Sequence, residues 1–292
     1  MERMGNLSES NDLATASAFA NSWNHVGQGS VYSRQQFLEW FAPLDPRSFS
    51  GKTVIELGFG NGSHLYHMAS YVPSRLCGVE LGDTLAQTRK NLEQISHVQV
   101  ELFRDDLTRI NLGEFDLAYC IGVLHHLQNP EEGFHAVLRH TRPGGYFHCW
   151  VYAHEGNALV IHLVDPIRRI CCLLPWWLTK YAIALPMVLP YYLWAKFLGW
   201  YTRRKREGAL FLRRFPLYEY TLWIAERPFR FFHHVAFDQL VTPQTAYMKR
   251  FEIEQWLQHP SIDPQSIYIV SRNGNSWKFG GKKRGGHEPH AL

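Results

Sequence analysis

A glycine-rich segment that begins with an acidic residue is the first feature of the sequence that could bind a ligand. Residues 56–62 read Glu-Leu-Gly-Phe-Gly-Asn-Gly. The first two of them end a short apolar, β-rich stretch, and the others form a glycine-rich turn. Glycines let the backbone turn tightly and approach a ligand closely. The acidic side chain can accept a hydrogen bond from that ligand. Taken alone, the segment is either a ligand cradle or a plain strand-to-helix turn.

Two further acidic positions follow the next two β-rich stretches. Glu80 ends residues 76–80, and Asp105 and Asp106 come just after residues 98–102. The end of the second strand is where an open α/β sheet places a carboxylate for the ribose hydroxyls of a nucleoside. The two aspartates either reach an adenine amino group or cap the turn that follows them. Carboxylates after three successive strands predict one nucleoside-binding crevice.

The position of Glu56 indicates which kind of nucleoside fits. A dinucleotide needs a pyrophosphate cradle at this turn, and a carboxylate inside the turn would repel a pyrophosphate. The same carboxylate suits the cationic methionyl end of a sulfonium cofactor. The pattern therefore favours a sulfonium nucleoside over a dinucleotide.

Residues 53–151 alternate short apolar strands with helices, and this alternation positions the acidic residues. The pattern predicts strands at residues 53–57, 76–80, 98–102, 115–119 and 146–151. It predicts helices over 63–71, over 83–94 with Asp83 as the N-cap, and from Pro130 to a turn at 142–145. Strands that alternate with helices form a parallel sheet covered on both faces. Further along, residues 250–258 read as a helix, and residues 266–271 and 277–280 as two strands joined by a hairpin-type turn.

An aromatic-rich insertion separates the fifth and sixth predicted strands. Between Cys171 and Trp200 it holds eight Trp, Tyr and Phe residues and prolines at 175, 186 and 190. Its charge-free core between Lys180 and Lys196 would span about 22 Å as a helix, whereas a bilayer core is about 30 Å thick. The stretch is therefore predicted to be too short and too broken to cross a membrane.

Basic runs follow the aromatic stretch at residues 203–206 and 213–214. Aromatic and apolar surface beside arginines is typical of an element that lies on anionic lipid. The insertion is either a helical lid whose aromatic side chains pack internally, or a lid that also contacts an anionic membrane surface. Both interpretations favour a substrate with a large apolar part.

The composition is that of a globular protein with a mild positive charge. Apolar residues make up 46% of the 292 residues, charged residues 19%, and the net charge is +4, so charge alone does not indicate nucleic acid. The five cysteines show no spacing typical of zinc or of a disulfide framework. No metal is therefore predicted, and a reduced, cytoplasmic setting fits best. The first 23 residues lack the apolar stretch of a signal peptide and read as a frayed end that leads into the fold.

Residues 53–151 resemble the class I S-adenosylmethionine-dependent methyltransferases, and most closely the branch of the ubiquinone and menaquinone C-methyltransferases. The resemblance rests on residues 56–62, on the segment Phe-Asp-Leu-Ala-Tyr-Cys-Ile-Gly-Val-Leu-His-His-Leu at 115–127, and on Arg-Pro-Gly-Gly at 142–145. Residues 19–23 and 272–277 resemble a bacterial subgroup of these enzymes with a long insertion after strand five. Many relatives carry Asp where this chain has Glu56, a change that keeps the charge.

The resemblance implies a Rossmann-like seven-stranded methyltransferase sheet with a mainly helical, aromatic-rich insertion between strands five and six. It divides the chain into an N-terminal cofactor-covering segment (1–52), a cofactor-binding core (53–151), a helical insertion or lid (152–245), a C-terminal helix and β-hairpin (246–281) and a disordered tail (282–292).

The same resemblance implies S-adenosylmethionine as the cofactor. The residues carried over to its site are Trp23, Glu56, Gly58, Gly60, Gly62, Glu80, Asp105, Asp106, Ile121 and Gly122. The glycine-rich segment would hold the methionyl and ribose portion, Glu80 the ribose diol and Asp106 the adenine, with the backbone of Ile121 and Gly122 near the sulfonium. The stretch around Trp23 and Gln28 either folds over the cofactor or, at Trp23, covers the edge of the sheet.

Candidate acid–base residues follow strands four and five. They are His125, His126, Tyr152 and His154, with Glu155 beside them. His126, by its place in the motif, is the more structural of the two adjacent histidines. A general base is needed only if the methyl acceptor is a weakly acidic hydroxyl or amine. His233, His234 and Asp238, near the end of the insertion, either close over the acceptor or are satisfied inside the insertion.

The sequence as a whole predicts a methyltransferase that acts by O- or C-methylation on a small or lipid-like acceptor with a large apolar part. It is expected to be cytoplasmic, with peripheral contact at the inner face of an anionic membrane as a further expectation, and no DNA partner. The alternative is an RNA or protein methyltransferase, although strand four lacks the Asn/Asp-Pro-Pro-Tyr/Phe sequence often used in methylation of base amines. A second alternative is a non-catalytic binding protein that keeps the fold.

Overall fold

The computed structural model describes residues 2–24, 32–204 and 210–285 of the chain. The chain divides into two compact units. The first unit comprises Met1–Tyr152, Ala246–Val270 and Trp277–Leu292, and the second comprises Ala153–Thr245 and Ser271–Ser276. Gln28, Lys205, Arg206 and the predicted tail beyond residue 285 lie outside the described residues.

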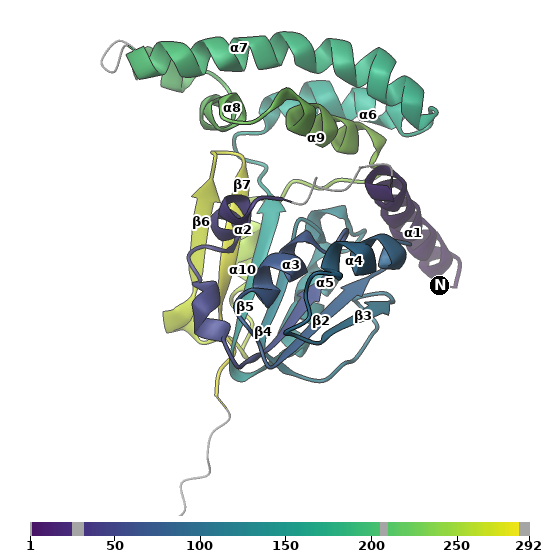
Figure 1. The fold of residues 1–292 in the computed structure, drawn as a ribbon, viewed down its shortest axis with the longest axis vertical. Helices are drawn as coiled ribbons and strands as arrows, with labels where there is room; N and C mark the ends of the chain where they lie inside the picture. The colour runs from purple at the N-terminus through teal and green to yellow at the C-terminus, as the bar shows by residue number, and fades with distance from the viewer. Residues whose placement is uncertain (1, 25–31, 205–209, 286–292) are drawn as a thin grey trace, which may run out of the picture. The chain divides into compact units, whose positions relative to one another are not determined.

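A seven-stranded sheet, counted over the described residues, forms the centre of the first unit, in the order β3-β2-β1-β4-β5-β7-β6 (Figure 1). The strands are β1 Thr53–Leu57, β2 Arg75–Glu80, β3 Val100–Arg104, β4 Phe115–Ile121, β5 Thr141–Tyr152, β6 Tyr268–Arg272 and β7 Ser276–Lys282. The pairs among β1 to β5 are parallel. β6 and β7 are neighbours joined by three residues, and only antiparallel strands can be joined so tightly. The predicted Rossmann-like seven-stranded sheet is confirmed.

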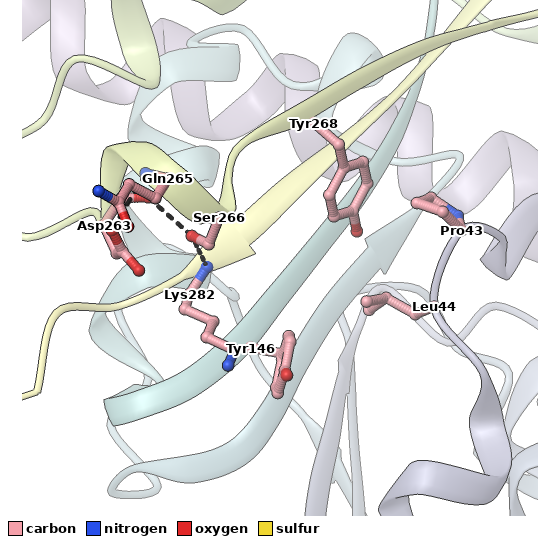
Figure 2. Close-up of a pocket in the computed structure, with 8 residues that line it drawn as sticks. All are labelled: Pro43, Leu44, Tyr146, Asp263, Gln265, Ser266, Tyr268 and Lys282. Carbon is pink, nitrogen blue, oxygen red and sulfur yellow. Dashed lines mark hydrogen bonds between the residues drawn. The ribbon is translucent and has the colours of Figure 1, made fainter.

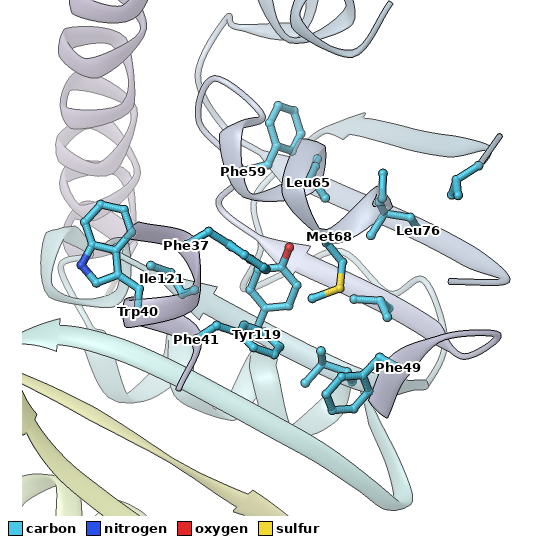
Figure 3. Packing of buried hydrophobic residues seen from close by; sticks show 14 of the residues in the cluster. Phe37, Trp40, Phe41, Phe49, Phe59, Leu65, Met68, Leu76, Tyr119 and Ile121 are labelled. Atoms are coloured by element: carbon cyan, nitrogen blue, oxygen red, sulfur yellow. The ribbon is translucent and has the colours of Figure 1, made fainter. Parts of the chain in front are cut away.

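Helices cover both faces of this sheet. The α-helices of the first unit are α1 Glu2–Asn24, α2 Arg34–Phe41, α3 Ser63–Ala69, α4 Leu85–Leu92, α5 Pro130–Arg139 and α10 Arg250–Trp256, with 3-10 turns at Pro46–Phe49, Leu124–His126 and Pro264–Ser266. On one face, Phe37 and Phe41 of α2 and Leu65 and Met68 of α3 pack around Tyr119 in one buried cluster (Figure 3). On the other face, a second aromatic group joins α5 and α10 to the sheet.

Side-chain alternation along the strands decides which residue faces which layer. On β5, His148 and Trp150 point to the α2 side, where His148 bonds to α2 and Trp150 joins the buried cluster around Tyr119. Phe147, the residue before His148, points to the other side and packs against Phe134 of α5. Trp256 of α10 stacks on the same Phe134 ring. A period of two therefore places each side chain of the strand in the core of one layer.

The predicted helix boundaries hold where the capping signals are local. Pro130 opens α5, and the side chain of Asn129 accepts a hydrogen bond from the backbone of Glu132, as an N-cap does. The prediction that Asp83 caps α4 is wrong, because α4 starts at Leu85 after Thr84 and Asp83 instead pairs with Arg104 at 3.3 Å. An ion pair with the neighbouring strand end has replaced the cap.

Two other expectations about segments of the first unit are wrong. The frayed N-terminal end is a helix, α1, and its residues Phe19 and Trp23 pack on each other. The turn expected at residues 142–145 lies within β5, where a register shift against β4 accommodates it and Arg142 pairs with Asp116 at 2.6 Å. At the start of the predicted tail, Lys283 forms a β-bridge with Ile262. Tertiary contacts order these segments although their local sequence does not.

The second unit is the helical insertion that the sequence predicts between the fifth and sixth strands. Its α-helices are α6 Asp165–Cys171, α7 Leu185–Arg204, α8 Tyr218–Ala225 and α9 Phe229–Val241, with π-helical turns at Val160–Val164 and Leu178–Ala184 and a 3-10 turn at Leu210–Arg214. Within this unit α7 runs along α8 and α9 (Figure 1).

The expectation that prolines break the aromatic stretch holds at Pro175, which lies between α6 and the next helix, and is wrong at Pro186 and Pro190. Leu178–Arg204 forms one continuous helix of 27 residues through Pro186 and Pro190. Pro186 and Pro190 each remove one backbone N–H donor from this helix, and packing of α7 against α8 and α9 compensates for the loss. Among the described residues this helix is the one that is long and apolar enough to cross a membrane by length and composition, although only 28% of its most apolar window is buried.

A buried histidine links three elements of the first unit. The imidazole of His148 contacts the carbonyl of Trp40 in α2 at 2.9 Å and the hydroxyl of Tyr268 in β6 at 2.7 Å. A carbonyl only accepts, so Nε2 carries the proton and Nδ1 accepts from Tyr268. Burial lowers the pKa of His148 from 6.5 to about 4, which keeps the ring neutral.

We expect the protein to lose stability as the pH falls below the pKa of an unfolded histidine. The unfolded ring titrates at 6.5 and the folded ring at about 4, so the contribution of neutral His148 is complete above pH 6.5 and is lost progressively towards pH 4. The full difference corresponds to about 3 kcal/mol of unfolding free energy. Urea unfolding at about pH 7 and about pH 5 measures this loss.

The control for this prediction is His148→Gln. The variant should unfold more easily at neutral pH, yet its stability should depend less on pH. Burial also lowers the pKa values of His67 and His140, so a residual slope is expected. An unchanged slope in the variant would show that His148 is not the titrating group.

Candidate functional site

The glycine-rich loop joins β1 to α3 at the carboxyl edge of the sheet. Gly60 has a φ of +56°, a left-handed conformation that L side chains rarely adopt. A Cβ atom on Gly60 would stand 2.5 Å from the ring of Trp23, so the close approach of α1 also requires glycine. Two side chains of α4 hold the loop from below: Thr88 donates to the carbonyl of Gly60 at 3.2 Å and Asn91 to that of Asn61 at 2.8 Å.

Glu80 ends β2 beside this loop. One carboxylate oxygen accepts the backbone N–H of Gly60 at 2.9 Å, and the other accepts that of Gly82 at 2.8 Å. Burial raises the pKa of Glu80 above its ordinary value of 4.5, and the backbone donors partly oppose that effect. The backbone of Leu81 is a third donor, and the carboxylate has capacity for one further donor. Binding of a ribose diol by Glu80 stays a prediction.

Glu56 lies under the loop and is fully buried. Its two oxygens contact Nδ1 of His64 at 3.0 Å and the hydroxyl of Tyr119 at 3.1 Å. Both oxygens therefore have partners inside the protein, and a contact between Glu56 and the methionyl end of a cofactor stays a prediction.

Sequence reasoning did not identify His64 or Tyr119 as part of the site. His64 stands in the first turn of α3 and is largely buried, and its Nε2 has no hydrogen-bond partner within the described part of the chain. Tyr119 lies directly opposite Glu56 in the β1–β4 pairing. That register was the signal that could have found Tyr119, because the carboxylate at a strand end faces its cross-strand neighbour.

Asp105 and Asp106 follow β3, as predicted, and both form local turn contacts. Asp105 accepts from the backbone of Asp106 at 2.7 Å. Asp106 accepts from the backbone and the hydroxyl of Thr108, at 2.8 Å and 2.7 Å. The capping alternative is therefore realised at both positions, and adenine binding by Asp106 stays a prediction.

Ile121 and Gly122 end β4 next to the loop. Ile121 is buried in the cluster of Figure 3, and Gly122 has a φ of +81° and donates its N–H to Trp150 at 3.1 Å. Their backbone lies at the carboxyl edge together with Glu80 and the glycine-rich loop, because β1, β2 and β4 are parallel neighbours.

Helix α1 packs over this edge through residues that sequence analysis had placed in a frayed end. The ring of Trp23 lies against Gly60, and Phe19 contacts the ring of His126 edge-on at 4.9 Å. Asp12 accepts the backbone N–H of Gln128 at 2.8 Å. Helix α1 thus contacts both the glycine-rich loop and the segment after β4.

Three of the four candidate acid–base residues lie together in the first unit. The ring of His125 is 4.1 Å from that of His126 and 4.0 Å from that of Tyr152, between ring centroids. Tyr247, which sequence analysis did not single out, stacks on Tyr152 at 6.3 Å. His125 has no exposed surface, whereas His126 keeps 8%. An acceptor would therefore reach His126 before His125.

The other candidates belong to the second unit. His154 and Glu155 are exposed and follow the end of β5. His233 bonds to the carbonyl of Lys180 at 2.8 Å, and His234 pairs with Asp238 at 3.2 Å. These last three side chains are satisfied within the helical unit.

A cavity of about 320 Å³ lies elsewhere in the first unit, between β5, the β6–β7 hairpin and the segment after α2 (Figure 2). Its lining includes Tyr146, Tyr268 and Lys282, and none of the predicted site residues borders it. Over the described residues, no group of three or more His, Cys, Asp or Glu side chains could hold a metal ion.

Comparison with known families and curated proteins agrees with this geometry. Residues 55–149 match the family described as "Methyltransferase domain". A ubiquinone biosynthesis O-methyltransferase of Thiobacillus denitrificans is 31% identical over 122 residues, which are 41% of this chain and 48% of that protein. A tRNA U34 carboxymethyltransferase of Desulfotalea psychrophila is 28% identical over 98 residues, which are 32% of this chain and 31% of that protein. The chain thus spans less than half the length of these curated relatives.

Among solved structures, the magnesium protoporphyrin IX methyltransferase of Synechocystis with bound SAH is similar at a TM-score of 0.51 and 14% identity. The similarity covers 90% of this chain and 93% of that one. At this identity it establishes the fold alone. Residues 55–149 thus match a methyltransferase domain, and the chain has the fold of this solved methyltransferase.

We expect Glu80→Gln to weaken binding of S-adenosylmethionine by at least about tenfold, because hydrogen bonds to a charged group are worth about 1.5–3 kcal/mol. The amide keeps the shape of the side chain but loses the charge. Isothermal titration calorimetry measures the affinity. The matched control is Glu101→Gln, which removes a carboxylate of the neighbouring strand that pairs with Arg75 at 3.0 Å. Equal affinities in the two variants would reject Glu80 as a ligand.

We expect Tyr119→Phe to lower the unfolding free energy by about 1–3 kcal/mol, because it leaves the buried Glu56 carboxylate without one donor. Tyr146→Phe is the control, since Tyr146 packs against the same cluster at its periphery and lies away from Glu56. Denaturant unfolding compares the two. A loss of similar size in both variants would mean that the hydroxyl of Tyr119 contributes nothing specific.

Proposed function

We propose that this protein is an S-adenosylmethionine-dependent methyltransferase that methylates oxygen or carbon of a small or lipid-like acceptor with a large apolar part. The single observation that carries the proposal is the Glu80 carboxylate, held by the N–H groups of Gly60 and Gly82 at the end of β2. A partly buried carboxylate with a spare lone pair beside a glycine-rich loop suits a nucleoside diol.

In this proposal the first unit binds and orients the reactants. S-adenosylmethionine, when bound, supplies an electrophilic methyl group. Glu80 holds the ribose, and the glycine-rich loop lets the backbone approach the ligand closely. Correct positioning supplies much of the acceleration of an in-line transfer. If the acceptor is a hydroxyl, His126 is the better candidate to take its proton, because the residue keeps 8% exposed surface while His125 has none.

Aromatic side chains support an acceptor with a flat or apolar part. Tyr152 contacts both histidines after β4, His125 contacts Trp150 edge-on at 5.8 Å, and Tyr247 stacks on Tyr152. Such rings bind apolar surface by stacking and burial. The likeness to a ubiquinone biosynthesis O-methyltransferase supports a small-molecule acceptor.

A second candidate is methylation or a related transfer on RNA. The likeness of the core to a tRNA U34 carboxymethyltransferase favours it, as do Arg203 and Arg204 at the end of α7 and Arg213 and Arg214 after it. Basic side chains bind phosphates, and that binding falls steeply with salt. The third possibility is a domain of this fold that binds no cofactor.

The test is calorimetric titration with S-adenosylmethionine, followed by incubation of the protein and labelled cofactor with a lipid extract or with bulk tRNA. We expect affinity on the order of micromolar and label in the organic phase after extraction. Label in tRNA, with binding that weakens steeply with salt, would replace the apolar acceptor by RNA. Absence of any cofactor binding would reject the enzyme and leave the non-catalytic alternative.

A further inference from the structure

The helical second unit exposes more large apolar side chains than the first unit does. Thirteen of the nineteen large apolar side chains exposed in the described residues lie between Leu159 and Trp200. We define the apolar face as Trp177, Tyr181, Leu189, Leu193, Phe197 and Trp200, which are each 44–60% exposed. They are spaced mostly by four or eight residues, and all lie on the helical segment from Trp176 to Arg204. Such spacing places side chains on one side of a helix.

The opposite side of α7 is bound to the rest of the unit. Val188 and Ala195 are buried against Ile224 of α8 and Phe232 of α9. Leu198 packs with Leu212 in a neighbouring cluster. Helix α7 therefore has one side that packs against the rest of the unit and another side whose large apolar side chains are exposed to solvent. Exposed apolar surface of this extent marks an interaction site.

Charge identifies the chemistry of the partner. Between Asp165 and Glu207 the sequence has eight basic residues and no acidic residue. Arg204 lies over the ring of Trp200 at 5.1 Å, and Lys180 lies 6.0 Å from the ring of Tyr181. Positive charge thus borders the apolar face at both ends. Trp and Tyr are the side chains enriched where a bilayer meets water.

We propose that the apolar face of α7 lies in the interfacial region of an anionic lipid bilayer, with the helix axis parallel to the membrane plane. The apolar face would enter the boundary between headgroups and acyl chains, and Lys180 and the arginines after Trp200 would contact lipid phosphates. This binding is a property of the helical unit, beyond the proposed methyl transfer, and would persist in a chain that binds no cofactor.

Polar contacts of α7 favour this in-plane position over a membrane-spanning one. Lys196 donates to the carbonyl of Ala225 at 2.7 Å. The hydroxyl of Tyr192 donates to the backbone carbonyl of Arg227 at 2.8 Å. Tyr191 shares a hydrogen bond with Thr221 at 2.6 Å. These bonds tie the middle of α7 to α8 and to the turn after it, so a spanning α7 would carry the arginine and polar backbone of that turn into the hydrocarbon layer.

The same charge argues against a second copy of the chain as the partner. A symmetric dimer brings identical surfaces together. Here the basic residues that border the apolar face would meet those of the second copy, and no acidic residue of the segment would pair with them. Anionic lipid supplies the missing negative charge.

The test is sedimentation of the full chain with vesicles of phosphatidylcholine alone or of equal parts phosphatidylcholine and phosphatidylglycerol. We expect binding to the anionic vesicles and at least about tenfold weaker binding to the neutral ones, as several basic residues contribute. The double variant Leu193→Ser, Phe197→Ser should bind the anionic vesicles at least about tenfold more weakly. The control is Phe251→Ser, which removes an equally exposed ring (51% against 50% for Phe197) from α10 of the first unit and should bind like the unaltered chain.

Calorimetry with S-adenosylmethionine on the same variants separates this inference from the proposed function. Intact cofactor binding with lost vesicle binding in the double variant supports the membrane surface. No vesicle binding by the unaltered chain overturns it and leaves the methyltransferase untouched. Release only by detergent, and not by alkaline carbonate, overturns it in favour of a spanning helix. A concentration-dependent dimer that the double variant abolishes overturns it in favour of self-association.

Discussion

The carboxylate of Glu80 is the group on which the carboxyl edge of the sheet in the first unit depends. By accepting the N–H groups of Gly60 and Gly82, it joins the loop after β1 to the turn after β2. Helix α4 supports the same loop from its carbonyl side through Thr88 and Asn91. The loop is thus held by donors and acceptors on both sides, and its left-handed glycine conformation is fixed before any ligand arrives. Such preorganisation lowers the entropic cost of binding.

Beneath that edge, the buried Glu56 imposes a second constraint. A carboxylate without exposed surface must be paired and hydrogen-bonded to be tolerated, and His64 and Tyr119 provide the two contacts. The glutamate side chain reaches both the first turn of α3 and the neighbouring strand β4. It ties together β1, α3 and β4, the three elements whose ends meet at the edge held by Glu80. Glu56 therefore connects the three elements from inside the fold.

Sequence reasoning succeeded where the signal was local and failed where distant partners decide. Alternating strands and helices, the start of α5 at Pro130 and the position of Glu80 at a strand end follow from patterns within a few residues. The contact between Glu56 and Tyr119 joins residues 63 positions apart and depends on strand register, which no short window contains. Helix α1 owes its order to Phe19 and Trp23 packing on the sheet edge, and Pro190 is tolerated because α7 rests on α8 and α9. Tertiary contacts overrode local propensity in both cases.

The two units differ in how completely they bury their large apolar side chains. In the first unit, Phe37, Phe41 and Tyr119 are completely buried, as the hydrophobic effect requires of a self-sufficient core. In the second unit, Val188 and Ala195 are buried while Leu193 and Phe197, on the same helix, remain 60% and 50% exposed. A helix that needed only to stabilise its own unit would place polar residues at those positions. Exposed Leu, Phe and Trp side chains lower the solubility of the protein in water. On an anionic lipid surface the same side chains, with the basic residues beside them, would contribute favourable free energy of binding.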